Sequence, residues 1–251
     1  MNTECNPDRI GHYPFVAESF HLDFSGHLLL SVLGNHLLNC SNRHSSDRGF
    51  GISLLNEHKY TWVLSRLSID LSEMPCQNEP FIIDTWVDSI YRLFTDRNYV
   101  IRSPQDKVLG YAKSVWAIID LESRKPIDLL SIDGGRIVEH ICKKECPINK
   151  PQRIRLSDKK EVVSEFTAAY TDIDMNGHFN SIKYIEHVMN TFSLDFYREK
   201  RLKHFEIAYV SECYFGDTIV ISREQIDATT YFIEIAKKGE KVLCRCSLLF
   251  E

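Results

Sequence analysis

The sequence predicts an α+β fold in which a long helix wrapped by an antiparallel sheet occurs twice. The first observation is an internal repeat, because residues 21–39 (HLDFSGHLLLSVLGNHLLN) align without a gap with residues 172–190 (DIDMNGHFNSIKYIEHVMN). Five of the nineteen positions are identical, and several others exchange one apolar residue for another. The second observation is that segments rich in β-branched and aromatic residues follow each repeat. The chain therefore reads as a duplicated helix-and-sheet unit.

The first half begins with a predicted helix near residues 27–42, which has apolar residues on most of its sides. Such a helix must be covered nearly all round by other elements. Four predicted strands follow it and can provide the cover: YTWVLSRLSIDL, FIIDTWVDSI, LFTDRNYVI and VLGYAKSVWAIID.

The second half repeats this plan. Apolar residues recur at steps of three and four and predict one face of a single helix: Ile182, Ile185, Met189, Phe192 and Phe196. The predicted strands are HFEIAYVSECYF, DTIVISRE, TYFIEIAKK and KVLCRCSLLF, with a hairpin turn at KKGEK. A helix wrapped by a four- or five-stranded, mostly antiparallel sheet, occurring twice, is the tandem or double hotdog architecture. A linker of Gly, Pro and charged residues separates the halves, so we expect domains at 1–150 and 151–251.

The bulk properties exclude several classes of protein. With 251 residues, of which 43% are hydrophobic, the chain can bury a sizeable core. No apolar run approaches the roughly 20 residues of a membrane-spanning helix, and the N-terminus lacks signal-peptide features, so we expect a cytoplasmic protein without membrane contact. The net charge of -5 argues against nucleic-acid binding. The eight cysteines lack zinc-ligand spacing, and we expect most of them to be reduced thiols.

Three polar residues, Asp174, Asn176 and His178, stand at alternate positions before the second predicted helix. A helix N-cap requires only one such side chain, which leaves the other two for another role. The free N–H groups of a helix N-terminus can hold a carbonyl oxygen that becomes an oxyanion during acyl transfer. We expect the backbone of Gly177 and His178 to supply this contact, because Gly177 lets a substrate approach closely.

The chemistry of these side chains suggests their roles. Asp174 can act as a base or nucleophile, Asn176 can orient a carbonyl or water, and His178 can move a proton near neutral pH. The first copy has Ser25 in place of Asn176, and three leucines follow its His27. We therefore expect catalysis in the second half and binding of an apolar acyl chain in the first. The candidates for acyl binding are Trp62, Leu64, Trp86, Leu29 and Leu33.

A Glu-Cys pair, Glu212 and Cys213, follows in a predicted strand. Successive strand residues point to opposite faces, so only one of the two can face a given site unless a bulge intervenes. A cysteine in a strand is usually a small buried hydrophobe, whereas a glutamate flanked by apolar residues is less easily explained by packing.

The pattern DIDMNGHFNSIKYI, followed about thirty residues later by YVSEC, resembles the signature of the plant and bacterial acyl-[acyl-carrier-protein] thioesterases. That family has D-x-N-x-H and then a Glu-Cys pair. The segments WVLSRL, DTWV and SVW resemble the family's N-terminal hotdog, and the resemblance runs from about residue 13 to the end. One departure is Ser181, where the family often has a second Asn.

The resemblance implies a thioester hydrolase that releases free fatty acid from acyl carrier protein (ACP) and so terminates fatty acid synthesis, without metal or organic cofactor. Carried over by position, the catalytic network would comprise Asp174, Asn176, His178, Glu212 and Cys213. Within the family the nucleophile has been assigned to the cysteine or to the acidic network, and we favour Asp174 with Glu212. The partner would be acidic acyl-ACP, docking on a basic patch. A homodimer is compatible with the sequence.

Three other functions remain open at this point. The chain could be an acyl-CoA thioesterase or hydroxyacyl dehydratase of the hotdog type, which would also use a helix N-terminus and an acidic or histidine side chain. It could be a non-catalytic acyl-binding module, which would not need the three polar residues together. A metal site built from Asp174, His178 and Glu212 would lack an evident fourth ligand.

Overall fold

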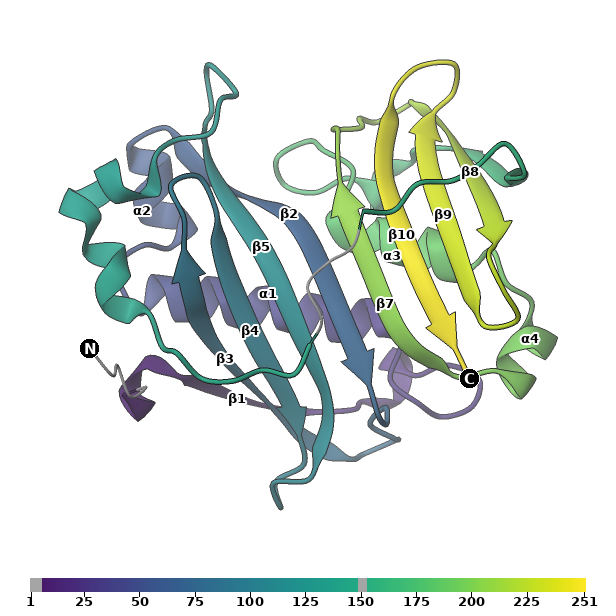
Figure 1. Cartoon of the computed structure of the whole chain (residues 1–251), viewed down its shortest axis with the longest axis horizontal. Coiled ribbons are helices and arrows are strands. Elements are labelled where there is room, and N and C mark those ends of the chain that lie inside the picture. The colour runs from purple at the N-terminus through teal and green to yellow at the C-terminus, as the bar shows by residue number, and fades with distance from the viewer. Residues whose placement is uncertain (1–5, 149–152) are drawn as a thin grey trace. The chain divides into compact units, whose positions relative to one another are not determined.

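The computed structural model describes residues 6–148 and 153–251. The chain divides into two compact units, Met1–Asn149 and Lys150–Glu251, which we call unit 1 and unit 2. Figure 1 shows that each unit has one sheet with a helix against one of its faces. Within the described residues, no helix is long and apolar enough to cross a membrane.

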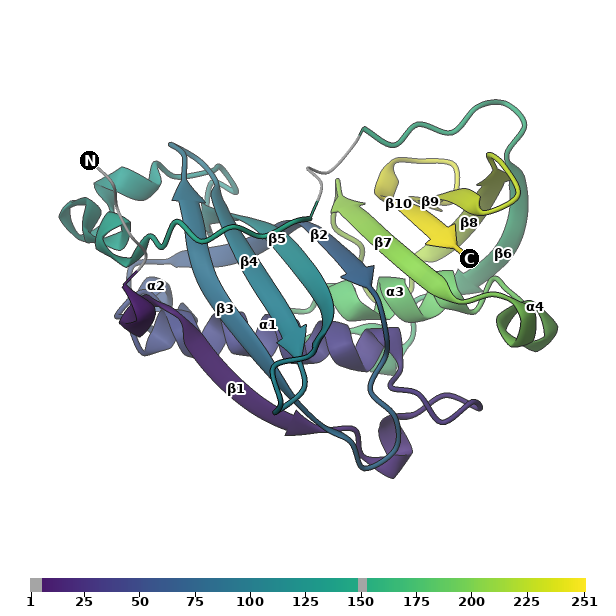
Figure 2. The same ribbon diagram turned by 60° about the horizontal axis from the view of Figure 1, so that its bottom comes forward.

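Unit 1 consists of a five-stranded antiparallel sheet and the helix α1, Leu30–Ser46. Its strands follow the order β1-β3-β4-β5-β2. In chain order they are β1 (Gly11–Val16), β2 (Tyr60–Leu71), β3 (Pro80–Ile90), β4 (Thr95–Arg102) and β5 (Val108–Asp120). The shorter helices are η1 (Pro7–Arg9), η2 (Ser19–His21), α2 (Ile52–Glu57) and η3 (Leu129–His140). The helix α1 crosses one face of this sheet (Figures 1 and 2).

Unit 2 has the same plan. Counted from its β6 edge, its strands follow the order β6-β8-β9-β10-β7. This is the order of unit 1, because β6 to β10 correspond in chain order to β1 to β5. They are β6 (Glu161–Thr167), β7 (Leu202–Tyr209), β8 (Thr218–Gln225), β9 (Thr230–Lys237) and β10 (Val242–Phe250). The helices are η4 (Tyr170–Asp172), α3 (Ser181–Met189) and α4 (Leu194–Glu199). Two antiparallel sheets with few helices fit a hotdog-like fold.

The structure differs from the sequence-based prediction at the sheet edges and in the helix of unit 2. Each sheet gains an edge strand before its helix, β1 and β6, which the sequence analysis missed. The prediction of one continuous helix through Phe196 is wrong. The helix α3 ends at Met189, and a separate helix, α4, begins at Leu194 after its N-cap Ser193. The hydroxyl of Ser193 accepts a hydrogen bond from the amide of Phe196 at 3.1 Å and so caps α4.

A buried polar layer fixes α1 to the sheet of unit 1. Arg97, only 4% exposed, donates from its guanidinium group to Thr85 Oγ1 at 3.3 Å and to Ser45 Oγ at 3.1 Å. The Tyr99 hydroxyl lies 2.5 Å from Ser41 Oγ in α1 and 2.7 Å from Ser114 Oγ. Because buried polar groups require hydrogen-bond partners, this layer defines how the helix is seated.

Two histidines make unit 1 sensitive to acid. Burial, with help from Arg97, lowers the pKa of His44 to about 3, and burial, with help from His21, lowers the pKa of His36 to about 4. Both folded values lie below the value of about 6.5 expected in the unfolded chain. The unfolded state therefore binds more protons below pH 6.5, and stability falls as the pH drops from 6.5 toward 4.

We expect the free energy of unfolding to fall by as much as about 2 kcal/mol per pH unit between pH 6 and pH 4.5. Urea denaturation at a series of pH values measures this slope. The variant His44→Gln should remove about half of it, whereas His58→Gln, an exposed position, should leave it unchanged. Equal slopes in wild type and His44→Gln would contradict the assignment to His44.

Most cysteines are free thiols, as expected. These are Cys40, Cys76, Cys146, Cys213, Cys244 and Cys246. Cys142 departs from that expectation because it is disulfide-bonded.

Candidate active site

The loop 173–180 is a closed turn built around Asp174. The Asp174 side chain accepts hydrogen bonds at Oδ1 from the amides of Asn176 at 2.8 Å and His178 at 3.1 Å. Its backbone carbonyl accepts from Gly177 at 3.0 Å, and Gly177 has a φ of +79°, a conformation that favours glycine. No hydrogen bond of Asp174 Oδ2 is found among the described residues, so one carboxylate oxygen builds the loop and the other is left for a ligand.

The helix α3 begins at Ser181 and is capped by Asn180, whose side chain accepts from the Ile182 amide at 2.9 Å. The amides of Gly177 and His178 therefore precede the helix by several residues, and both already donate to Asp174. The expectation that these two amides stand free at the helix N-terminus is not met in this structure. A substrate oxygen would have to compete with Asp174 for them.

Glu212 and His178 lie next to each other although they are far apart in the sequence. His178 Nε2 is 3.7 Å from Glu212 Oε2, and both side chains are partly exposed. The Tyr214 hydroxyl donates to the same Glu212 oxygen at 3.0 Å, and its ring meets the His178 ring edge-on at 5.4 Å between centroids. Because Asp174 holds the backbone of His178, the structure brings Asp174, His178 and Glu212 into one cluster.

Tyr214 is a site residue that the sequence analysis missed. Its position directly after the Glu-Cys pair was the only sequence feature that pointed to it. That position becomes informative once the β-bridge between His178 and Tyr214 is known. Asn176 is exposed on the same loop, where its side-chain amide can reach a bound ligand.

Cys213 faces away from this cluster. Its side chain is buried at 1% exposure, and its thiol donates to the Tyr214 carbonyl at 3.8 Å. Burial, followed by the nearby Asp217 carboxylate, raises the pKa of the Cys213 thiol to about 11. Burial and the raised pKa both disfavour the thiolate that a cysteine nucleophile requires. The strand β7 ends at Tyr209, so the two residues lie in the loop after it rather than within a strand.

Unit 1 contains the same two loops, which serve as an internal comparison. Asp23 Oδ1 accepts from the amides of Ser25 at 2.8 Å and His27 at 3.1 Å, as Asp174 does in unit 2. The Ser25 hydroxyl donates to Asp23 at 2.7 Å and lies 2.9 Å from His27 Nδ1. The turn is therefore preserved in both units, and its polar groups in unit 1 are bonded to one another.

The hydrogen bonds between the two loops align unit 1 with unit 2. The Leu28 amide donates to the Pro75 carbonyl at 2.9 Å, as the Phe179 amide donates to the Cys213 carbonyl at 2.8 Å. Pro75 thus corresponds to Cys213, and the residue before it, Met74, corresponds to Glu212. A thioether cannot accept a proton in place of a glutamate, so unit 1 lacks the acidic partner of its histidine.

Three of the five candidates for acyl binding lie on the side of the unit 1 sheet that faces α1. Leu33 is fully buried in α1. Leu64 stands opposite Trp116 in the β2/β5 pair, and the Trp116 indole donates to Ser114 Oγ in the layer beneath α1. Trp62 shares the face of Leu64, because residues two apart in a strand point the same way.

The other two candidates lie elsewhere. Trp86 is fully buried, but it follows Thr85, which faces α1, and so it points to the opposite face of the sheet. There it packs with Val100 and Cys142. Leu29 is 40% exposed just before α1. Trp86 therefore cannot line the same chamber as Leu33, and the prediction for Trp86 is corrected on this geometry.

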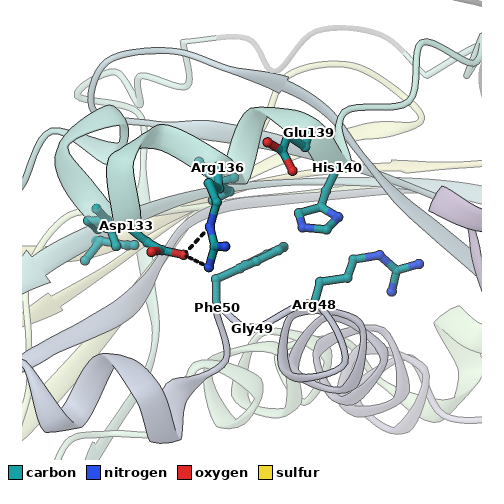
Figure 3. A pocket seen from close by; sticks show the side chains of 10 residues that line it. Arg48, Gly49, Phe50, Asp133, Arg136, Glu139 and His140 are labelled. Carbon is teal, nitrogen blue, oxygen red and sulfur yellow. Dashed lines mark hydrogen bonds and ion pairs between the residues drawn. The ribbon is translucent and has the colours of Figure 1, made fainter.

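Two cavities in unit 1 are lined by other residues. One has a volume of about 240 Å³ and is lined by Phe50, His140 and charged side chains that include Arg48 and Arg136 (Figure 3). Within its lining, the Arg136 guanidinium pairs with Asp133, three residues earlier in η3, at 2.6 Å. The other cavity, of about 430 Å³, lies beside His21 and His36. In the part of the chain that the structure describes, no group of three or more His, Cys, Asp or Glu residues is placed to hold a metal ion.

A hotdog-like fold in which a histidine pairs with one glutamate and follows an aspartate-built loop is compatible with a thioester-cleaving protein. The sequence matches the acyl-ACP thioesterase N-terminal domain over residues 13–131 and the acyl-ACP thioesterase C-terminal domain over residues 155–249. These two segments together cover most of the chain. The chain belongs to the acyl-ACP thioesterase family.

Individual relatives agree with this assignment. The crystal structure of an acyl-ACP thioesterase from Bacteroides thetaiotaomicron is 51% identical, with a TM-score of 0.92, and the match covers 97% of this chain and 98% of that one. The 12:0-ACP thioesterase from Umbellularia californica shares the fold at 16% identity, with a TM-score of 0.82 and 97% of both chains covered. The chloroplastic oleoyl-acyl carrier protein thioesterase of Coriandrum sativum is 22% identical over 88% of this chain. The chain spans only 64% of that plant protein's length.

Proposed function

We propose that this protein is an acyl-ACP thioesterase that hydrolyses the thioester of fatty acyl-ACP to free fatty acid and holo-ACP and so terminates fatty acid synthesis. The observation that carries the proposal is the His178–Glu212 pair, held by the Asp174 loop in unit 2 and missing its carboxylate in unit 1. The family of the chain supports the same substrate class.

The geometry supports hydrolysis by an activated water. Glu212 accepts a proton from water, whose oxygen attacks the thioester carbonyl carbon while Asp174 Oδ2 orients it. The C–S bond then breaks as His178 donates a proton to the departing sulfur, which gives a carboxylic acid and a free thiol. The Asn176 amide is the available donor for the developing oxyanion, and the amides of Gly177 and His178 can contribute only if Asp174 releases them.

We further propose that the two units form a double hotdog with divided roles. The C-terminal unit, residues 151–251, performs the chemistry, and the N-terminal unit, residues 1–150, binds the acyl chain beside α1. Leu33, Leu64 and Trp62 are the contacts that the geometry supports, because they share the α1 side of the sheet. Each buried methylene contributes about 0.8 kcal/mol, so the depth of this space would set chain-length preference. Cytoplasmic localisation and a homodimer remain predictions from the sequence.

Thiol release tests the function directly. Mixing the protein with acyl-ACP should release one thiol per acyl group hydrolysed, with kcat/KM at least about tenfold above that for the matched acyl-CoA. Faster hydrolysis of acyl-CoA would assign the alternative, an acyl-CoA thioesterase. Binding of acyl-ACP without thiol release would identify a non-catalytic acyl-binding module instead.

A further inference from the structure

Four large apolar side chains project into solvent from the two loops that carry the site of unit 2 and from the short helix η4 before the first of them. Tyr170 is 85% exposed, Met175 is 92%, Phe215 is 69% and Tyr214 is 47%. Exposed aromatic and methionine side chains are enriched at protein–protein contacts. We call these four residues the apolar rim.

Backbone hydrogen bonds tie together the two segments that carry the rim. The Ala168 amide donates to the Asp217 carbonyl at 2.9 Å, and the Gly216 amide donates to the Ala168 carbonyl at 3.0 Å. These bonds place Phe215 beside the segment that leads into Tyr170. Met175 and Tyr214 lie on the same loops as Asp174 and Glu212, so the rim borders the reacting groups.

Unit 1 carries polar residues at two of the equivalent positions, although Phe20 and Phe24 of the same segment are themselves 99% and 50% exposed. The bond from the Asn78 amide to the Ala17 carbonyl, at 2.9 Å, matches that from Gly216 to Ala168. Gln77 therefore corresponds to Phe215, and the sequence repeat makes Ser19 the counterpart of Tyr170. In unit 1 these two polar residues bond to each other, from Gln77 Nε2 to Ser19 Oγ at 3.0 Å. The same backbone framework thus carries a closed polar pair in one unit and two exposed aromatic rings in the other.

The lysines near the rim are engaged in ion pairs. Lys237 Nζ lies 3.0 Å from Asp217 Oδ1, and Lys238 Nζ lies 2.6 Å from Glu165 Oε1. Charges paired in this way add little attraction for a charged partner. The chemistry that the rim offers to a partner is therefore apolar contact, in contrast to the basic patch expected from the sequence.

We propose that the apolar rim is the docking surface for the carrier protein that delivers the acyl thioester. This inference rests on the proposed function, because the occupant follows from the reaction. A thioester tethered to a carrier protein can reach His178 and Glu212 only if the carrier binds close to these two residues. The rim borders both of them. The acyl chain itself requires an enclosed space, whereas Tyr170 and Phe215 face water.

The double variant Tyr170→Ser, Phe215→Gln tests the proposal by installing the residues of unit 1. We expect KM for acyl-ACP to rise about tenfold or more, since truncating aromatic anchors at an interface commonly has effects of this size. Turnover of a small acyl N-acetylcysteamine thioester should stay within about twofold of wild type. The effect on KM should be the same at low and high ionic strength, because apolar contacts are not screened by salt.

Matched controls separate the possible failures. Phe20→Thr removes a ring of unit 1 that is 99% exposed. The new threonine matches Thr171, the equivalent residue of unit 2. This change should alter the kinetics of neither acyl-ACP nor the small thioester. Thermal melting checks that the double variant is folded, and Phe215→Gln alone provides a milder second variant. Wild type that fails to hydrolyse acyl-ACP overturns the proposed function. If wild type is active but the folded variants keep the same KM for acyl-ACP, only the rim proposal is overturned. The same holds if the double variant loses equal activity on the small thioester. It also holds if its sedimentation changes and so shows that the rim is an interface between copies of this chain.

Discussion

Replacing Glu212 by glutamine is expected to lower kcat for acyl-ACP by about 100- to 10,000-fold, the range that a positioned general base contributes. Glutamine preserves size and can still accept the Tyr214 hydrogen bond, but it cannot take a proton from water. Steady-state thiol release measures the loss. The stability of the variant should be close to that of wild type, because the side chain is partly exposed.

The adjacent variant Cys213→Ala is the matched control. At pH 7 a thiol with a pKa of about 11 is ionised in only about one molecule in 10,000, and its sulfur is buried. We expect kcat to stay within about tenfold of wild type, with some loss of stability from the cavity. A folded Cys213→Ala protein without activity, beside an active Glu212→Gln protein, would transfer the nucleophile to the cysteine.

The second large effect is expected at Asp174. Asparagine can still accept the backbone hydrogen bonds of Asn176 and His178 through its side-chain oxygen, so the loop should keep its shape. It loses the carboxylate charge and the acceptor at Oδ2 that orients water. We expect kcat to fall about 100- to 10,000-fold with little change in melting temperature.

Asp23→Asn offers the corresponding change in unit 1, where the same two backbone bonds are formed. It should leave kcat for acyl-ACP unchanged, because Met74 occupies the position of the glutamate. Equal losses in the two variants would mean that Asp174 acts only through the fold of its loop. That result would remove it from the chemistry.

Strong periodic segments were predicted well from the sequence. The predicted strand at residues 60–71 coincides with β2, and that at 108–120 coincides with β5, because long runs of β-branched and aromatic residues leave few alternatives. The edge strands β1 and β6 escaped notice. β1 contains Pro14, which is tolerated only at a sheet edge, and half of its residues face solvent.

The candidate site was predicted in part. Spacing alone identified the Asp174 loop, since three polar residues exceed the needs of a cap. That Glu212 lies beside His178 was implied by the family resemblance rather than by the residues, because contact between positions so far apart depends on tertiary packing. The helix start was misplaced for a local reason, since Asn180 rather than an earlier residue forms the cap. The choice of Glu212 over Cys213 rested on strand alternation, which does not apply because both residues lie in the loop after β7. Burial of the thiol favours the same choice.

The methionine at position 74 has a consequence for stoichiometry. Two identical subunits with complete loops would carry two reaction centres per assembly, whereas this fused chain retains the carboxylate in one loop only. Saturation of the reaction centre should therefore require no more than one acyl group per polypeptide. Met74 and Ser25 stand where the C-terminal loop has Glu212 and Asn176, so proton transfer is expected in unit 2 alone.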